Sequence, residues 1–286
     1  MPRLQVFQSI WAMEQRRPDK VEWSLEDKIA RVADAGYDGL DVYVERTEVT
    51  RRAAELLAKR GLGVSLSGFP KCLDDVRQGI ALFHEIGAVH YNVIGQIYPL
   101  TVDEGARELR RWIEACDEAR VPVLVETHRD CITTDLLYTL QLMDALPEMR
   151  ICADLSHYLV AREFSWPVSV ENHAQVRRVL ERADAFQGRV ASREQIQVQT
   201  SFPQHREWFE LFQRWWEEGF RLWRARHGAD DTLNFLCELG PKEYAMTGPD
   251  GYELSDRWEE ALSIRDAVQR IWTALGVEEA GAGRAT

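Results

Sequence analysis

The chain alternates short apolar runs with longer segments in which apolar residues recur at helical spacing. The apolar runs have the length of buried strands, and several of the helical segments end at a glycine. The unit repeats every 25–35 residues or so, about the spacing expected of successive β/α units. Strands are predicted at residues 4–10, 39–44, 63–66, 89–94, 121–125, 150–153, 185–190 and 232–237.

Eight strands that mostly alternate with helices predict a single (β/α)8 barrel over residues 1–276. A doubly wound sheet is the rival, but no GxGxxG or GxxxxGK[ST] turn follows the first predicted strand. An extra aromatic-rich helix is expected near residues 205–226, where Trp208, Phe212, Trp215 and Trp216 recur at helical spacing. We expect this stripe to pack against the barrel or a partner subunit and not to bind a ligand. Residues 277–286 are small and polar, which predicts a disordered, flexible tail.

Composition narrows the class of protein. The 286 residues carry a net charge of −12, which argues against a protein that grips phosphate backbones. Five cysteines are scattered without a CxxC pair, as in proteins of a reducing cytoplasm. No apolar run approaches membrane-spanning length. We therefore expect a cytoplasmic protein with no nucleic-acid or membrane partner.

Three predicted strands end in a carboxylate: Glu126, Asp154 and Glu238. A carboxylate after a strand is often only the cap of the next helix, as expected for Asp135. In a barrel, however, the carboxyl ends of the strands build the active site. Three carboxylates that converge there would repel one another without a cation, and a divalent metal would relieve that repulsion.

The segments VETHRD, ADLSH, QGRV and CELGPKEY at the last four strands resemble the xylose-isomerase-like TIM-barrel superfamily, the sugar phosphate isomerases and epimerases. The resemblance implies one divalent ion (Mn2+, Mg2+, Co2+ or Zn2+) and two glutamates that exchange a proton with the substrate. Carried over, Glu126, Asp154 and Glu238 would be metal ligands, and Glu126 and Glu238 also the catalytic pair. Gln187 stands where the family usually has histidine. It would be a weaker ligand, or a water replaces it, or tight metal binding is lost.

Four further residues are candidates for substrate binding. By the resemblance, His157 would bind the substrate or brace the metal site. His128 shares a strand face with Glu126 and either reaches the pocket or bonds to loop backbone. Arg189 would hold an anionic or hydroxylated group, and Trp11 would face a sugar ring.

The leading hypothesis is a metal-dependent isomerase or epimerase, or a related lyase, acting on a sugar-like polyol or hydroxyketone. It would abstract a proton next to a metal-bound carbonyl. One alternative is a non-catalytic or metal-weakened barrel that binds a ligand or partner. An endonuclease-like phosphodiester hydrolase is a further alternative, disfavoured by the acidic charge. The expected partner is a small carbohydrate-like substrate, and assembly into a homo-oligomer stays open.

Overall fold

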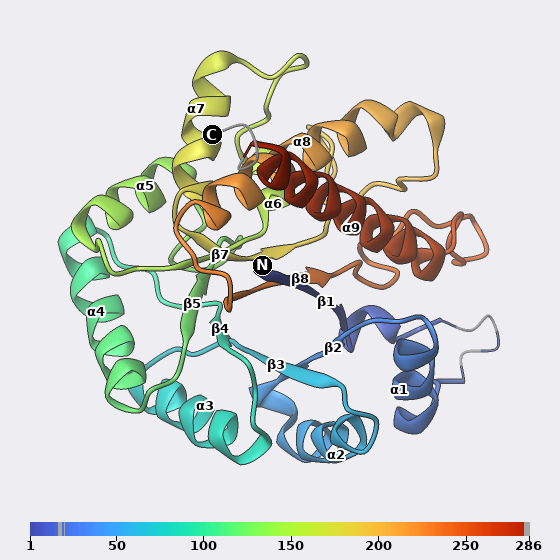
Figure 1. Cartoon of the computed structure of the whole chain (residues 1–286), viewed down its shortest axis with the longest axis horizontal. Coiled ribbons are helices and arrows are strands. Elements are labelled where there is room, and N and C mark those ends of the chain that lie inside the picture. The colour runs from blue at the N-terminus through green and yellow to red at the C-terminus, as the bar shows by residue number, and fades with distance from the viewer. Residues whose placement is uncertain (17–18, 20, 283–286) are drawn as a thin grey trace.

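A computed structural model describes residues 1–16, 19 and 21–282 of the chain. Parallel strands close into a barrel in sequence order, with β1 paired to both β2 and β8 (Figure 1). This confirms the predicted (β/α)8 fold. The strands are β1 (Arg3–Ser9), β2 (Gly39–Tyr43), β3 (Gly63–Gly68), β4 (Tyr91–Val93), β5 (Val123–Glu126), β6 (Ile151–Ala153), β7 (Ala183–Gln187) and β8 (Thr232–Cys237).

Helices surround the barrel, and several of them begin at a residue whose side chain caps the first turn. Ser24 accepts a hydrogen bond from the Asp27 backbone N–H at the start of α1, and Asp135 does the same for Tyr138 at α5. The helices are α1 (Leu25–Asp34), α2 (Thr47–Ala58), α3 (Leu73–Ile86), α4 (Val102–Glu118), α5 (Leu136–Ala145), α6 (Leu155–Ala161), α7 (Val170–Leu180), α8 (Arg206–Arg224) and α9 (Arg257–Ala282). Short 3-10 turns lie at Trp11–Met13, Val44–Arg46 and Pro203–His205.

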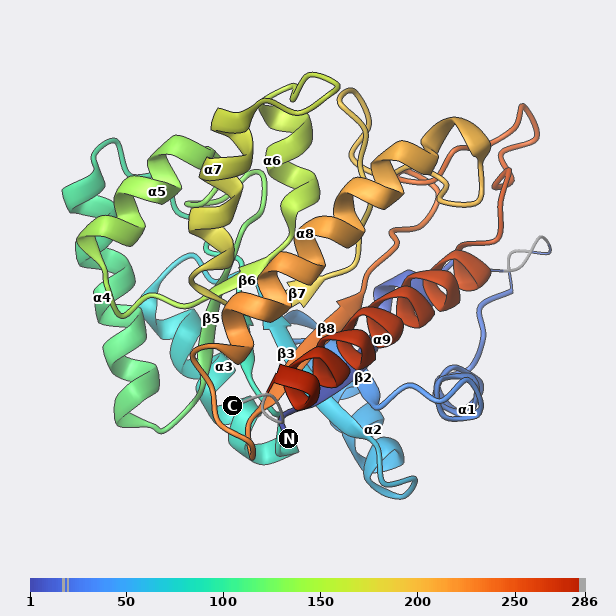
Figure 2. The same ribbon diagram turned by 45° about the horizontal axis from the view of Figure 1, so that its top comes forward.

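The aromatic-rich segment forms α8, which lies beside α9 (Figure 2). Helix α8 packs against β7, and α9 packs against β1 and β8. Trp215 and Trp216 are buried, and the Trp216 ring meets Phe235 of β8 edge-on at 5.2 Å between centroids. The predicted packing role of this stripe is therefore confirmed. No helix among the described residues is both long and apolar enough to cross a membrane.

Three segments differ from the sequence-based prediction. Strand β7 starts and ends earlier than residues 185–190, and a register shift lies beside it at Ile151 and Cys152. Helix α6 had not been predicted. Helix α9 begins at Arg257, after a segment that folds back through an antiparallel bridge between Thr247 and Glu253. It also continues to Ala282, so residues 277–282 of the expected tail are helical and 283–286 lie outside the described residues.

Candidate functional site

The four strand-end residues singled out in the sequence meet at the carboxyl end of the barrel. Glu126 and Gln187 are the last residues of β5 and β7, and Asp154 and Glu238 directly follow β6 and β8. All four are buried. One oxygen each from Glu126, Asp154 and Glu238 lies within 4.8 Å of the others, so the carboxylates form a candidate metal-binding group.

Glu126 sits where two amide side chains can reach it. Asn92 of β4 and Gln187 of β7 both donate a hydrogen bond to its Oε2 atom. Burial, followed by the charges of Glu238 and Asp154, raises the pKa of Glu126 well above its usual value. Burial therefore favours the neutral form of the Glu126 carboxyl group.

Asp154 both caps a helix and belongs to the carboxylate group, and its position after a strand allowed either role. As the N-cap of α6, its Oδ1 atom accepts hydrogen bonds from the backbone N–H of Ser156, at 2.9 Å, and from the Ser156 hydroxyl. Its Oδ2 atom lies 3.2 Å from Nε of Arg189. The cap fixes the carboxylate while its second oxygen faces the barrel centre.

Arg189 lies at the centre of the cluster, two residues beyond Gln187, with its side chain 1% exposed. Its Nη2 atom donates to Glu238, whose other oxygen accepts the Tyr43 hydroxyl at 3.2 Å. Burial would lower the pKa of Arg189, but Glu238 and Asp154 outweigh it and hold that pKa above its usual value. Burial has the opposite effect on the acidic residue Glu238: it raises the pKa of this carboxyl group, and the charge of Arg189 opposes that rise.

Two histidine rings, His128 and His157, lie 4.1 Å apart between centroids. Nδ1 of His128 donates to the Arg129 carbonyl, so the backbone-bonded alternative holds for this residue, although its side chain also lines the cavity. His157 has Nε2 3.4 Å from Oδ2 of Asp154, and neither ring nitrogen has a hydrogen-bond partner among the described residues. Burial lowers the pKa of both imidazoles, which favours their neutral forms. Together with Glu126 they form a second candidate metal group.

A cavity of about 280 Å3 opens above these groups. Trp11, predicted to face a sugar ring, lies in its wall with Tyr244, and their rings meet edge-on at 5.1 Å. Across the cavity, the rings of Tyr43 and Phe69 stack at 6.1 Å. The lining residues are Trp11, Tyr43, Glu45, Arg46, Phe69, Ile94, Glu126, His128, Arg189, Glu238 and Tyr244.

The sequence-based reading missed three aromatic residues of this wall: Tyr43, Phe69 and Tyr244. Tyr43 ends a predicted strand and Phe69 follows one closely, so their position at the carboxyl ends of strands was the available signal. Tyr244 lies in the CELGPKEY segment, but it reaches the cavity only through the fold of the loop after β8. Gln197 and Gln199, in the loop after β7, are buried as well.

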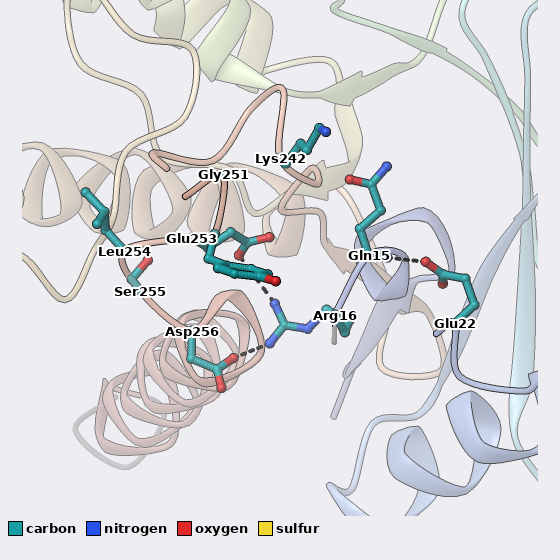
Figure 3. Close-up of a pocket in the computed structure, with 10 residues that line it drawn as sticks. Gln15, Arg16, Glu22, Lys242, Gly251, Glu253, Leu254, Ser255 and Asp256 are labelled. Atoms are coloured by element: carbon teal, nitrogen blue, oxygen red, sulfur yellow. Dashed lines mark hydrogen bonds and ion pairs between the residues drawn. The ribbon is translucent and has the colours of Figure 1, made fainter. Parts of the chain in front are cut away.

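A larger cavity, about 570 Å3, lies between the segment after the first 3-10 turn and the segment before α9. There Arg16 pairs with Glu253 at 3.6 Å and with Asp256 (Figure 3). The Gln15 backbone N–H donates to Glu22 on the opposite wall. The site carboxylates do not line this cavity, so we place the chemistry in the smaller one.

The fit of a divalent ion to the carboxylate group can be judged from the donors around it. The hard oxygens of Glu126, Asp154 and Glu238 suit such an ion. However, Arg189 already donates to Asp154 and Glu238, and Gln187 turns its N–H rather than its oxygen toward Glu126. In this arrangement the residues do not fit a divalent ion, because the guanidinium would have to leave first.

No protein-family model and no curated protein matches the sequence. Solved structures do match. A xylose isomerase-like TIM barrel protein from Mycobacterium smegmatis, in complex with magnesium, aligns with a TM-score of 0.61 at 14% identity over 94% of this chain and 97% of its own. D-psicose 3-epimerase with D-tagatose from Clostridium cellulolyticum H10 gives 0.56 at 10% identity, over 94% and 99%. An AP endonuclease of family 2 from Brucella melitensis gives 0.54 at 11%, over 85% and 94%. These likenesses establish a xylose isomerase-like TIM-barrel fold, which is the fold that the sequence resemblance implied.

Proposed function

We propose that this barrel is a sugar isomerase or epimerase that moves a proton at a carbon next to a carbonyl group. The observation that carries the proposal is the pair of buried carboxyl groups, Glu126 and Glu238, whose pKa values are both raised. They line one cavity of about 280 Å3, near the lower end of the range for small-molecule sites. The neighbouring folds include sugar epimerases, which supports the same substrate class.

The surroundings of the two glutamates assign them different roles. Arg189 and the Tyr43 hydroxyl both donate to Glu238 and favour its charged form, so Glu238 is the base. Glu126 has no cationic hydrogen-bond partner among the described residues, and burial raises its pKa, which favours the protonated form. It is the acid that returns a proton to the substrate. Groups whose environments separate their pKa values in this way can act as an acid–base pair.

The aromatic wall suits a substrate with both apolar and hydroxylated faces. Trp11 and Tyr244 offer ring surfaces for the C–H face of a sugar. Neutral His128 and His157 carry ring nitrogens that can hydrogen-bond to hydroxyl groups. A phosphodiester is less well supported, because the Glu45 and Glu238 side chains line the same cavity and would oppose its negative charge.

The sequence resemblance also predicts a divalent ion on Glu126, Asp154, Gln187 and Glu238. When bound, such an ion would polarise the substrate carbonyl. Because Arg189 lies in the way, proton transfer is assigned to the chain's own groups.

The test is exchange of carbon-bound hydrogen with solvent. We would incubate the protein with a panel of ketoses and hydroxyketones in D2O and follow the loss of C–H signals by proton NMR. Glu238→Gln and Glu126→Gln should each slow exchange by about 100-fold or more. Glu48→Gln, on the exposed surface of α2, is the matched control and should exchange at the wild-type rate. Exchange that persists unchanged in both site variants would refute the roles of the two glutamates. No exchange by wild type with any compound of the panel would favour a barrel that binds without turnover, the alternative reading.

A further inference from the structure

The chain itself supplies a positive charge to the carboxylate cluster of Glu126, Asp154 and Glu238. Arg189 bridges two elements of the ring: its Nε donates to Asp154 at 3.2 Å, and its Nη2 donates to Glu238. The remaining oxygens of these two carboxylates are engaged as well, by Ser156 and by the Tyr43 hydroxyl. All four oxygens of Asp154 and Glu238 therefore have donors.

Glu126 is engaged on one side only. Asn92 and Gln187 both donate to Oε2, whereas Oε1 has no hydrogen-bond partner among the described residues. Gln187 must present its N–H here, because an amide oxygen placed against a carboxylate oxygen would be repelled. The amide that replaces the family's usual histidine thus acts as a donor to a carboxylate and turns its ligand atom away.

The guanidinium also has a free hydrogen-bonding position. Nη1 of Arg189 is buried and has no partner within the part of the chain that the structure describes. The guanidinium lies 4.9 Å from the Tyr244 ring centroid and 5.7 Å from that of Trp11, the two rings of the cavity wall. A buried N–H without a partner is costly, and a substrate oxygen would satisfy it.

We propose that Arg189 takes the place of the divalent ion in this barrel, both as the cation of the carboxylate cluster and as the group that holds the substrate carbonyl oxygen. The first part stands on the geometry alone. The second rests on the proposed isomerase or epimerase function. Arg suits both tasks, because its planar fork pairs with two carboxylates and still offers a further N–H.

The reaction balances without a metal. Glu238 takes the proton from the carbon next to the carbonyl, and the electrons of that C–H bond form a C=C bond. The carbonyl electron pair moves to oxygen, which Nη1 of Arg189 holds as an oxyanion. Glu126 then returns a proton to the carbon, the carbonyl re-forms, and the product is an epimer of the substrate. Exchange with water resets both glutamates, and no oxidant or reductant is consumed.

The decisive experiment titrates Mn2+ alone into wild type, Arg189→Met and Arg189→Lys. Calorimetry measures the binding. Wild type should bind Mn2+ no more tightly than the millimolar range. Removing the competing charge in Arg189→Met should tighten binding at least ten-fold, whereas Arg189→Lys should stay close to wild type. Arg193→Met is the matched control, since Arg193 lies in the loop after β7 and pairs with Glu163 and Glu194 on the surface. It should leave Mn2+ binding unchanged.

Two results would overturn the proposal. One is wild-type protein that carries near one equivalent of a divalent ion, or that binds Mn2+ in the micromolar range. The other is an Arg189→Met protein, folded by circular dichroism, that binds no more tightly than wild type. If Arg189→Met does not fold, the wild-type titration still decides. Deuterium exchange after dialysis against EDTA separates the two proposals: exchange abolished by EDTA and restored by Mn2+ refutes the role of Arg189, whereas no exchange under either condition counts against the enzyme function only.

Discussion

Asp41, on β2, is a further buried carboxyl group, and it allows a quantitative prediction about stability. Its Oδ1 atom accepts hydrogen bonds from the hydroxyls of Ser65, at 2.7 Å, and Ser67, at 3.1 Å. Its Oδ2 atom has no partner among the described residues. Burial is the main cause that raises the pKa of Asp41 from 3.8 to about 8, against the two serine hydroxyls.

The sign of the effect follows from proton uptake. Between pH 3.8 and about 8 the unfolded chain has lost the Asp41 proton while the folded chain keeps it. Folding is therefore penalised as pH rises, by about 1.4 kcal/mol per pH unit, and the loss levels off above the folded pKa. At pH 7 the penalty reaches roughly 4 kcal/mol as an upper bound.

Asp41→Asn removes this penalty, because the amide does not ionise and its oxygen still accepts from Ser65 and Ser67. The new Nδ2 donor would lack an acceptor, which costs about 1–3 kcal/mol. The variant should therefore be about 1–3 kcal/mol more stable than wild type at pH 7, and close to wild type at pH 5. Guanidinium unfolding at pH 5, 7 and 8.5 measures both, with the exposed Asp74→Asn as control. A stability difference that is the same at all three pH values would refute the reasoning, since ionisation of Asp41 would then play no part.

Three further substitutions test the site and the packing around it. Glu238→Gln should lower kcat by about 100-fold or more while the fold is kept, because Arg189 retains Asp154 as a partner; steady-state kinetics and circular dichroism check this. Gly79→Ala should destabilise the fold by about 1–3 kcal/mol, because the Cβ atom of alanine would overlap the Tyr91 ring, although alanine favours helices. Urea unfolding measures the loss, and an unchanged midpoint would contradict the overlap. Arg257→Met should lower the free energy of unfolding by about 3–5 kcal/mol, since Arg257 donates to the carbonyls of Ala12, Glu14 and Leu239 and pairs with Glu253. Thermal unfolding measures this loss, and a loss under about 1 kcal/mol would mean that water replaces these bonds.

The strands and most helices could be predicted because their patterns are local. The apolar run at residues 232–237 gives β8 at the same bounds as the structure, and the aromatic-rich segment near residues 205–226 gives α8. Helix α6 escaped prediction because its sequence, LSHYLVA, is buried on several sides and shows no polar face. The start of α9 depends on the bridge between Thr247 and Glu253, which no periodicity reveals.

The candidate site was predictable as far as strand ends could mark it. Glu126, Asp154, Gln187 and Glu238 converge because the carboxyl ends of parallel strands share one edge. The hydrogen-bonding direction of the Gln187 amide was not predictable, since it depends on Glu126 from another strand. The position of the Tyr244 ring was not predictable either, because the loop after β8 must fold over the barrel before the ring can pack on Trp11.

The positive charge in the carboxylate cluster could be predicted from the sequence only in part. Three converging carboxylates require a cation, and that requirement follows from the sequence alone. The identity of the cation does not. Gln187 ends β7 and Arg189 follows two residues later in the loop, and the fold brings both an amide and a guanidinium into the same cluster. Arg189 is long enough to reach Asp154 and Glu238 at once. The cation is then covalently part of the chain and is present whenever the barrel is folded, so the cluster is compensated at any concentration of metal ions.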